Sequence, residues 1–339
     1  MKLYIVVAVW RNTKDNHAGM YYLAQQIKER SELSVKIIPT PTRGSRFLYW
    51  AYRAFNVLIG CWLLFTVRKN DVVFLMEYLL RETEQSDIAR MLKGRCRVEG
   101  IAHLVPERID REYPEDQIRR KAGYLSRLYV LGTSLRTYFV QKGIPVEKVM
   151  ATYHYVDTEY YTPLAETGAE ETPLRVICMG NMERNYDDLI KIISDCPEMQ
   201  FIVCMGKNDI SSLFAGLGNV ILHGFLDEWQ LLRFMQHSDV SLNVMKDTVG
   251  SNVITTSLAC GLAVVASNVG SIGDYIQDRK NGILFNCNTE AVKALRNLAR
   301  KRTELFRMQT EARRRAEELG IDGFIRWFEN QMLPKRKTD

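Results

Sequence analysis

The sequence predicts an α/β protein with two Rossmann-like domains that face each other across a cleft. Apolar runs of strand length alternate with helical patterns from residue 3 to residue 154, and the same alternation restarts at residue 174. Strands that alternate with helices predict parallel βαβ units and a doubly wound sheet. Between the two halves, the stretch 162–173 (TPLAETGAEETP) holds two prolines and a run of Gly, Glu and Thr, which is typical of a linker.

Each predicted strand is a short, mostly apolar run, and each predicted helix repeats apolar residues at helical spacing. In the first half the expected strands are 3–10, 35–39, 71–76, 98–105, 127–131 and 148–154, and the expected helices are 20–30, 46–67, 82–93, 116–122 and 133–142. In the second half the expected strands are 174–179, 200–205, 220–223, 240–244, 263–266 and 283–285, and the expected helices are 186–195, 210–214, 228–237, 252–260, 272–276, 289–319 and 322–332. Ligands of such sheets bind beyond the carboxyl ends of the strands.

Charge is divided unevenly between the two halves. Residues 1–155 hold 25 Lys/Arg and 15 Asp/Glu, a net charge of +10, whereas residues 156–339 hold 21 and 25, a net charge of −4. A basic first half suits an anionic acceptor or an anionic membrane surface. Because no DNA- or RNA-binding motif is present, nucleic acid is not an expected partner.

The cysteines and the N-terminus indicate the compartment. The seven cysteines stand singly without CxxC spacing, which argues against a zinc site or a disulfide framework and favours a reducing cytosol. The first ten residues, MKLYIVVAVW, predict a strand rather than a signal peptide. We therefore expect a cytoplasmic protein.

Four stretches resemble the family 4 glycosyltransferases, also called glycosyl transferases group 1, which have the GT-B fold. The longest, 238–285 (SDVSLNVMKDTVGSNVITTSLACGLAVVASNVGSIGDYIQDRKNGILF), is similar to the C-terminal core of that family. The stretch 177–192 (ICMGNMERNYDDLIKI) is similar to its donor-phosphate loop. The stretches 142–163 (KGIPVEKVMATYHYVDTEYYTP) and 16–27 (NHAGMYYLAQQI) are similar to the end of its N-terminal domain and to its glycine loop.

The resemblance implies a domain plan and a reaction. It implies an acceptor-binding domain over residues 1–165, a nucleotide-sugar-binding domain over 174–319, and a helix in 320–339 that returns to the N-terminal domain. The activity would be that of a retaining hexosyltransferase with no cofactor and no metal. Its donor would be a UDP- or GDP-linked sugar and its acceptor a glycan or a lipid-linked molecule, in surface polysaccharide biosynthesis.

The resemblance also locates the donor-binding residues in the second half. They are Gly180, Asn181, Arg184, Gly224, Thr248, Gly250, Ser251, Asn252 and Thr256. Arg184 aligns with a lysine that contacts the donor diphosphate, and the fork of a guanidinium can bond two phosphate oxygens. A solvated loop arginine is the alternative interpretation. The helix that starts after Ser251 offers backbone amides to a phosphate, although capping alone would explain this serine.

Thr248 and Thr256 depart from the family pattern. Many members place glutamate at both positions, one toward the transferred sugar and the other toward the ribose. Threonine retains a hydroxyl for hydrogen bonding but carries no charge. The change leaves open whether the domain is active.

In the first half, the resemblance indicates His103 as the catalytic residue, and His17 and Gly19 as a loop that contacts acceptor or phosphate. His103 follows the fourth predicted strand, where it could stabilise developing charge near the sugar. A strand-end histidine bonded to local backbone is the competing interpretation. Gly19 precedes the first helix, and a glycine there permits close approach of a ligand to the backbone.

The apolar helix expected over 46–67 has two interpretations. It is either a buried helix of the first domain or a helix that lies in the membrane surface. The apolar run 55–67 is flanked by basic residues: Arg43, Arg46 and Arg53 stand before it, and Arg68 and Lys69 follow it. The second interpretation places the protein peripherally at the inner face of the cell membrane, on anionic lipid.

Two other functions are compatible with the same fold. A catalytically inactive GT-B subunit would act as a scaffold or a sugar-binding partner, and the threonine pair favours it. A sugar-nucleotide epimerase would need carboxylates in the cleft, which the threonine pair disfavours.

Overall fold

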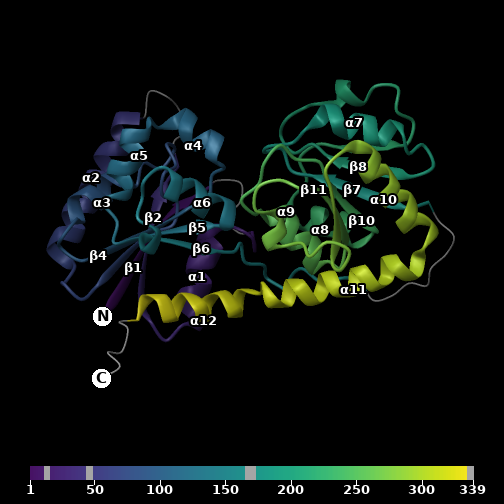
Figure 1. Cartoon of the computed structure of the whole chain (residues 1–339). Coiled ribbons are helices and arrows are strands. Elements are labelled where there is room, and N and C mark those ends of the chain that lie inside the picture. The colour runs from purple at the N-terminus through teal and green to yellow at the C-terminus, as the bar shows by residue number, and fades with distance from the viewer. Residues whose placement is uncertain (11–15, 43–48, 165–172, 334–339) are drawn as a thin grey trace. The chain divides into compact units, whose positions relative to one another are not determined.

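The computed structural model describes residues 1–10, 16–42, 49–164 and 173–333, and these form two compact units (Figure 1). The first unit comprises Met1–Tyr153 and the segment that starts at Ile321, and the second comprises His154–Gly320. Within the described residues, each unit contains one six-stranded sheet in which all paired strands are parallel. Most of the expected linker, residues 165–172, lies outside the described residues.

The first unit has the strand order β2-β1-β3-β4-β5-β6. Its strands are β1 (Lys2–Val9), β2 (Ser34–Pro41), β3 (Val72–Leu75), β4 (Arg97–Ala102), β5 (Arg127–Leu131) and β6 (Val149–Thr152). Its helices are α1 (Met20–Arg30), α2 (Tyr49–Thr66), α3 (Ser86–Leu92), α4 (Pro106–Glu112), α5 (Glu115–Ala122), α6 (Thr133–Gln141) and α12 (Ile321–Met332), with a 3-10 turn, η2 (Val146–Lys148).

The second unit has the strand order β12-β11-β10-β7-β8-β9. Its strands are β7 (Arg175–Met179), β8 (Gln200–Cys204), β9 (Val220–His223), β10 (Val240–Asn243), β11 (Ala263–Ser267) and β12 (Gly282–Phe285). Its helices are α7 (Tyr186–Ser194), α8 (Glu228–Gln236), α9 (Asn252–Ala259), α10 (Asn288–Arg300) and α11 (Arg302–Glu318), with 3-10 turns η3 (Ser211–Phe214) and η4 (Ile272–Asp274).

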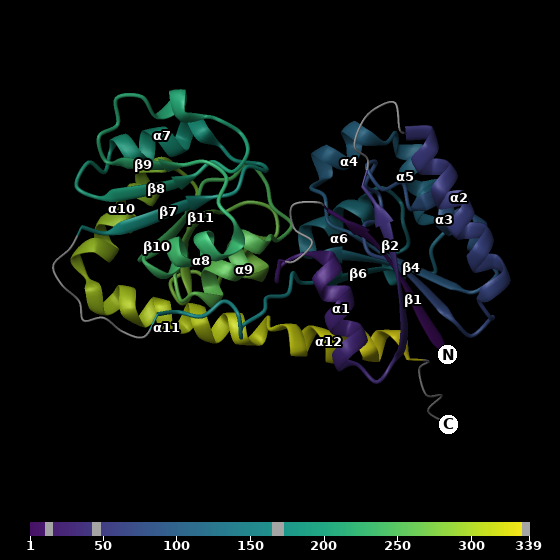
Figure 2. The same ribbon diagram turned by 180° about the vertical axis from the view of Figure 1, so that it is seen from behind.

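Different helices cover the two faces of the first sheet. Alternate residues of a strand point to opposite faces. On one face Tyr4 contacts Trp62 of α2, with ring centroids 6.2 Å apart. On the other face Phe74 contacts Phe328 of α12 at 4.9 Å. Figure 2 shows α12 beside α1, and the two helices are in contact.

The chain turns between α10 and α11, where the sequence predicts one helix over 289–319. Lys301, with φ −109° and ψ 71°, is not helical. The break lets each helix bury its own apolar side, because α10 packs against α7 and α11 packs against α9. The continuous helix is therefore wrong at this residue. Helix α4, which begins at Pro106, is not among the helices that the sequence predicts.

Residues 154–165, expected in the first domain, lie with the second unit from His154 onward as far as the structure describes them. The Val156 N–H donates to the Leu319 carbonyl oxygen at 3.1 Å, and the His154 N–H donates to the Tyr275 hydroxyl at 2.9 Å. These long-range bonds fix the segment to the second unit.

The described residues include no helix that is both long and apolar enough to cross a bilayer.

Candidate functional site

The topological switch point of the second sheet lies between β7 and β10. Strand β7 pairs with β8 on one side and with β10 on the other. From β7 the sheet is extended by β8 and β9 in one direction and by β10, β11 and β12 in the opposite direction. Crevices at such points are where open α/β sheets bind ligands. The loops beyond the two strands are joined, because the Asn185 N–H donates to the Val244 carbonyl oxygen at 3.1 Å and the Lys246 N–H to that of Glu183 at 2.8 Å.

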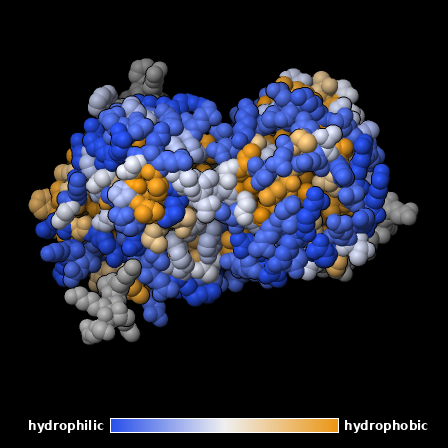
Figure 3. All heavy atoms as spheres, viewed as in Figure 1, coloured by the Kyte–Doolittle hydropathy of each residue, from blue (hydrophilic) through white to orange (hydrophobic). Residues whose placement is uncertain are grey.

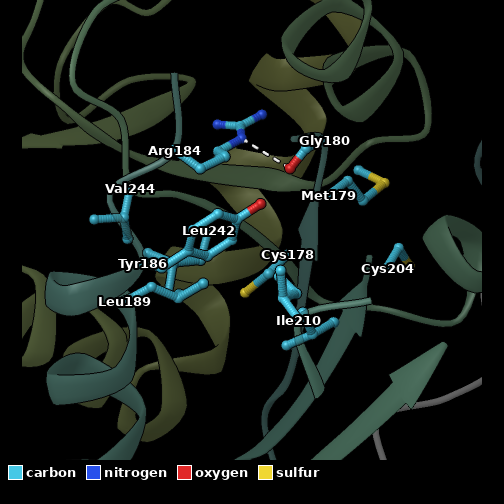
Figure 4. A pocket seen from close by; sticks show the side chains of 11 residues that line it. Cys178, Met179, Gly180, Arg184, Tyr186, Leu189, Cys204, Ile210, Leu242 and Val244 are labelled. Carbon is cyan, nitrogen blue, oxygen red and sulfur yellow. Dashed lines mark hydrogen bonds between the residues drawn. The ribbon is translucent and has the colours of Figure 1, made fainter. Parts of the chain in front are cut away.

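Arg184 projects from the first of these loops (Figure 4). Its Nε donates to the Gly180 carbonyl oxygen at 3.3 Å, and the residue is half-buried. Its Nη1 is buried and has no hydrogen-bond partner among the described residues. Burial lowers the pKa of the guanidinium to about 10, so it remains a cation at neutral pH. A buried cationic donor without a partner is unfavourable, and an anion would satisfy it.

The N-terminus of α9 lies beside this cation. A Cβ atom at Gly180 would come within 2.8 Å of Arg184 Nη2 and 3.1 Å of Val253 Cγ2, in the first turn of α9. Ser251 occupies the N-cap position, but its hydroxyl makes no capping bond and is buried without a partner, as is Asn252 Oδ1. Helix N-termini and arginine both favour anions, so this edge of the sheet is a candidate phosphate site.

Gly250 lies directly against Tyr275, a residue that the sequence does not indicate as part of the site. Its φ is +105°, a region that favours glycine, and a side chain there would overlap the hydroxyl of Tyr275. Tyr275 is fully buried and accepts the bond from His154 N–H. The only signal in the sequence is an aromatic residue shortly after the Gly270-Ser271 loop, and it does not reveal this long-range contact.

Thr248 and Thr256 are both buried at the same edge of the sheet. The Thr248 hydroxyl accepts from the Gly250 N–H at 3.2 Å, and the Thr256 hydroxyl donates to the Asn252 carbonyl oxygen at 2.6 Å. Both hydroxyls therefore support the local backbone, and neither supplies charge.

Asn181 and Gly224 lie further from the switch point. The Asn181 amide lies against Gly206, at the end of β8, with Nδ2 2.7 Å from the position of a Cβ. Gly224 is exposed and follows β9, the edge strand. The structure thus gathers Gly180, Arg184, Thr248, Gly250, Ser251, Asn252 and Thr256 around β7 and β10, places the Asn181 amide beside the end of β8, and leaves Gly224 apart.

In the first unit, the predicted residues follow two different strands. His103 comes directly after β4 and is half-buried. Gly19 is the N-cap of α1, with φ −97°, so its backbone conformation does not require glycine. The His17 ring lies 5.0 Å from that of Tyr22.

Glu77, which the sequence interpretation missed, lies at the switch point of the first sheet, where β1 pairs with both β2 and β3. Its Oε2 accepts bonds from Ala8 N–H and Gln85 Nε2, both at 3.0 Å. Its Oε1 is buried without a partner, and burial raises the pKa of the carboxyl to about 8. The available signal is a single carboxylate inside the apolar run VVFLMEYLL.

Asp187 and Asp188 lie in the first turn of α7, where Asn185 caps the helix by accepting from the Asp188 N–H at 3.3 Å. The described residues contain no group of three His, Cys, Asp or Glu side chains that could hold a metal ion.

Most of the second unit matches a known protein family. Residues 173–301 match the family model of the glycosyl transferases group 1. A comparison with curated protein sequences gives no match.

Solved structures share the whole fold at low sequence identity. The Anabaena protein Alr3699/HepE, solved with UDP-glucose, is 12% identical, with a TM-score of 0.74 over 98% of this chain and 99% of that chain. Sucrose-phosphate synthase from Thermosynechococcus elongatus is 10% identical, with a TM-score of 0.76 over 98% of both chains. The lipopolysaccharide outer core galactosyltransferase WaaB is 14% identical, with a TM-score of 0.70 over 97% of this chain and 98% of that chain.

The match over residues 173–301 confirms the expected family for the second unit, and the solved structures confirm the expected fold for the chain. The second unit carries a glycosyl transferases group 1 domain, and the chain as a whole has the GT-B fold. The chain is a glycosyltransferase.

Proposed function

We propose that this glycosyltransferase transfers a hexose-type sugar, with retention of configuration, from a nucleoside diphosphate donor to a glycan or lipid-linked acceptor in surface polysaccharide biosynthesis. The buried Nη1 of Arg184 at the β7/β10 switch point, which has no hydrogen-bond partner among the described residues, is the observation that carries this proposal. Because HepE is solved with UDP and with UDP-glucose, a UDP-sugar is the first donor to test, with GDP-sugars as the alternative.

The donor diphosphate would lie between Arg184 and the N-terminus of α9. When the bond between the sugar C1 and the phosphate oxygen breaks, its electron pair stays on the diphosphate. Arg184 and the amides at the start of α9 would stabilise that charge as it grows, which lowers the barrier. On this basis we propose that leaving-group stabilisation comes from the protein and needs no metal.

The sugar and ribose would be bound by neutral hydrogen bonds. Thr248 and Thr256 are buried beside the start of α9, where their hydroxyl lone pairs are available to donor hydroxyls. Asn181 and Gly224 would contact the donor further along the sheet edge. A donor held without the usual carboxylates would gain less selectivity between sugars, because neutral bonds are weaker than charge-assisted ones.

The first unit would bind the acceptor, with support from its net charge of +10 over residues 1–155. The acceptor hydroxyl oxygen forms the new bond to C1, and its proton passes to the departing phosphate oxygen, so charge and atoms balance. We assign His103 to the sugar site, and His17 and Gly19 to the acceptor or phosphate loop. We further place the enzyme at the inner face of the cell membrane, where a lipid-linked acceptor is available.

A thermal-shift screen with a panel of UDP- and GDP-sugars tests the donor assignment. A ligand that binds the native state alone raises the melting temperature, and the rise grows with the logarithm of the ligand concentration divided by its dissociation constant. We expect one nucleotide class to raise it in the wild type and not in Arg184→Ala, with Arg300→Ala, an exposed arginine of α10, as the matched control.

Detection of the transferred sugar then separates an active enzyme from an inactive subunit. A protein that binds a nucleotide-sugar but neither transfers nor hydrolyses it would be a sugar-binding partner, which is the alternative that the threonine pair favours. Interconversion of the free donor sugar would instead identify an epimerase.

A further inference from the structure

Helix α2 carries an apolar face that is open to solvent. Trp50 is 74% exposed, Leu58 67% and Phe65 92%. Within the described part of the helix, residues 50–66, the exposed residues are all apolar: Trp50, Ala51, Ala54, Phe55, Val57, Leu58, Cys61, Trp62 and Phe65. Their spacing of three and four residues puts them along one side. Orange residues reach the left edge of the surface, where Figure 1 shows α2 (Figure 3). A contiguous apolar patch marks an interaction site.

The opposite side of α2 is held firmly to the first unit. Arg53 forms two bonds to the Asp87 carboxylate, from Nε at 2.7 Å and from Nη2 at 2.6 Å. The Asn56 amide donates to the Thr83 carbonyl oxygen at 2.9 Å, and Ile59 and Leu63 are buried. The helix also packs against α3. The apolar face is therefore fixed in place, and it is not a core surface left open by a loose helix.

Positive charge borders this face. Lys36 Nζ lies 4.3 Å from the centroid of the Trp62 ring, and Arg68 and Lys69 follow the helix at the exposed surface. The helix itself, YWAYRAFNVLIGCWLLFT, contains no acidic residue. Trp50 lies in the first turn of the helix and Trp62 near its end. Tryptophan favours the boundary between lipid and water.

These features favour a bilayer that contains anionic lipid as the partner. A second copy of the chain docked through the same face would bring cations toward cations, whereas anionic headgroups would neutralise them. A bilayer also accepts a long apolar helix face without a complementary groove. We propose that the exposed face of α2 is a membrane-binding surface that inserts shallowly into an anionic leaflet, with Arg68 and Lys69 at the headgroups.

The exposed face of α2 would account for the membrane location proposed above, and its binding to lipid does not depend on sugar transfer. The test is co-sedimentation of the full chain with phosphatidylcholine vesicles, with and without phosphatidylglycerol. We expect binding that requires phosphatidylglycerol and weakens with added salt, because salt screens the attraction. Leu58→Ser/Phe65→Ser should lower the partition coefficient by at least about tenfold, since two exposed apolar side chains no longer insert.

Matched variants separate the surface from general effects. Phe306→Ser removes a 54% exposed apolar ring from α11 and should leave vesicle binding unchanged. Arg68→Gln/Lys69→Gln should weaken binding and flatten its salt dependence, whereas Lys293→Gln/Arg300→Gln in α10 should not. Brominated lipids should quench tryptophan fluorescence less in Trp50→Phe/Trp62→Phe than in Trp229→Phe.

Two results would overturn the proposal. One is a folded wild type that fails to bind phosphatidylglycerol vesicles at low salt. The other is a concentration-dependent dimer that Leu58→Ser/Phe65→Ser abolishes, which would mean that a second copy covers the face. Donor binding by the same variants, measured without vesicles, should be unchanged, so failure of the donor assignment would be seen separately.

Discussion

Arg184 Nε donates to the carbonyl oxygen of Gly180 at 3.3 Å, while Nη1 of the same guanidinium is buried without a partner. The bond closes the loop after β7 and holds the side chain beside the first turn of α9. A buried donor without a partner costs about 1–3 kcal/mol. The native protein thus retains an unfavourable group at the edge where sheets of this type bind ligands.

Gly250→Ala should destabilise the protein and weaken donor binding. Gly250 combines a positive φ with a position where a side chain would overlap Tyr275. Strain of this kind costs on the order of 1–3 kcal/mol before the overlap is added. Urea unfolding measures the loss. Gly216→Ala is the control, because Gly216 also has a positive φ but has no neighbour within 4 Å of a Cβ. Equal losses in the two variants would contradict the steric part of the argument.

Glu77 should make the protein less stable as the pH rises from about 4.5 to about 8. The pKa of its carboxyl is raised to about 8 in the fold, from 4.5, because burial disfavours the charged form. The folded state therefore binds a proton that the unfolded state has released between these values. The free energy of unfolding then falls with a slope of up to about 1.4 kcal/mol per pH unit, and levels off above the folded pKa.

Glu77→Gln should remove this slope, because the amide does not ionise and can still accept from the Ala8 N–H. Unfolding free energies measured across the pH range give the comparison. Glu147→Gln, at an exposed position, should keep the wild-type slope. A Gln variant with the wild-type pH dependence would show that another group titrates.

Phe328→Ala should destabilise the protein by about 3–5 kcal/mol, which is typical of a deleted buried aromatic side chain. Phe328 is 1% exposed and contacts Phe74 and Phe324, so it fixes α12 to the first unit. Thermal unfolding measures the loss, and Phe306→Ala, at a largely exposed ring, is the comparison. A loss no greater than that of the comparison variant would mean that α12 adds little to the first unit.

His103→Ala should lower kcat on the order of 100-fold while donor affinity changes little. An interaction made mainly in the transition state affects turnover more than ground-state binding. Steady-state kinetics with direct donor titration separates the two effects, and His237→Ala, at an exposed histidine of the second unit, is the control. Unchanged turnover would give His103 a structural role.

Much of the fold could be predicted because its signals are local. Helix α1 and strands β5 and β9 begin and end at the predicted residues, since short apolar runs bounded by polar turns define them. The break at Lys301 has no such signal: the residues on both sides favour helix, and packing of α10 on α7 and of α11 on α9 decides it.

In the candidate site, too, some residues could be located from local sequence and others depend on long-range contacts. Gly180 and Arg184 could be located from one loop, because the residues that define it are adjacent in the chain. Tyr275 beneath Gly250 and Glu77 beside Ala8 could not, because each contact joins segments that only the folded sheet brings together. The buried, unpartnered atoms of Arg184 and Ser251 likewise become visible only once the loops after β7 and β10 are in place.

The most direct test of the central claim is kcat/KM of the wild type, Arg184→Ala and Arg184→Lys with the cognate donor. Loss of one charge-assisted contact to a desolvated diphosphate should cost about 2–4 kcal/mol in the transition state, or about 30- to 1000-fold in kcat/KM. Arg184→Lys should recover part of the loss, because the charge remains while the fork is lost. Melting curves check folding, and Arg300→Ala should match the wild type. An Arg184→Ala variant that stays folded and keeps near-normal kcat/KM would contradict the assignment of this residue to the donor diphosphate.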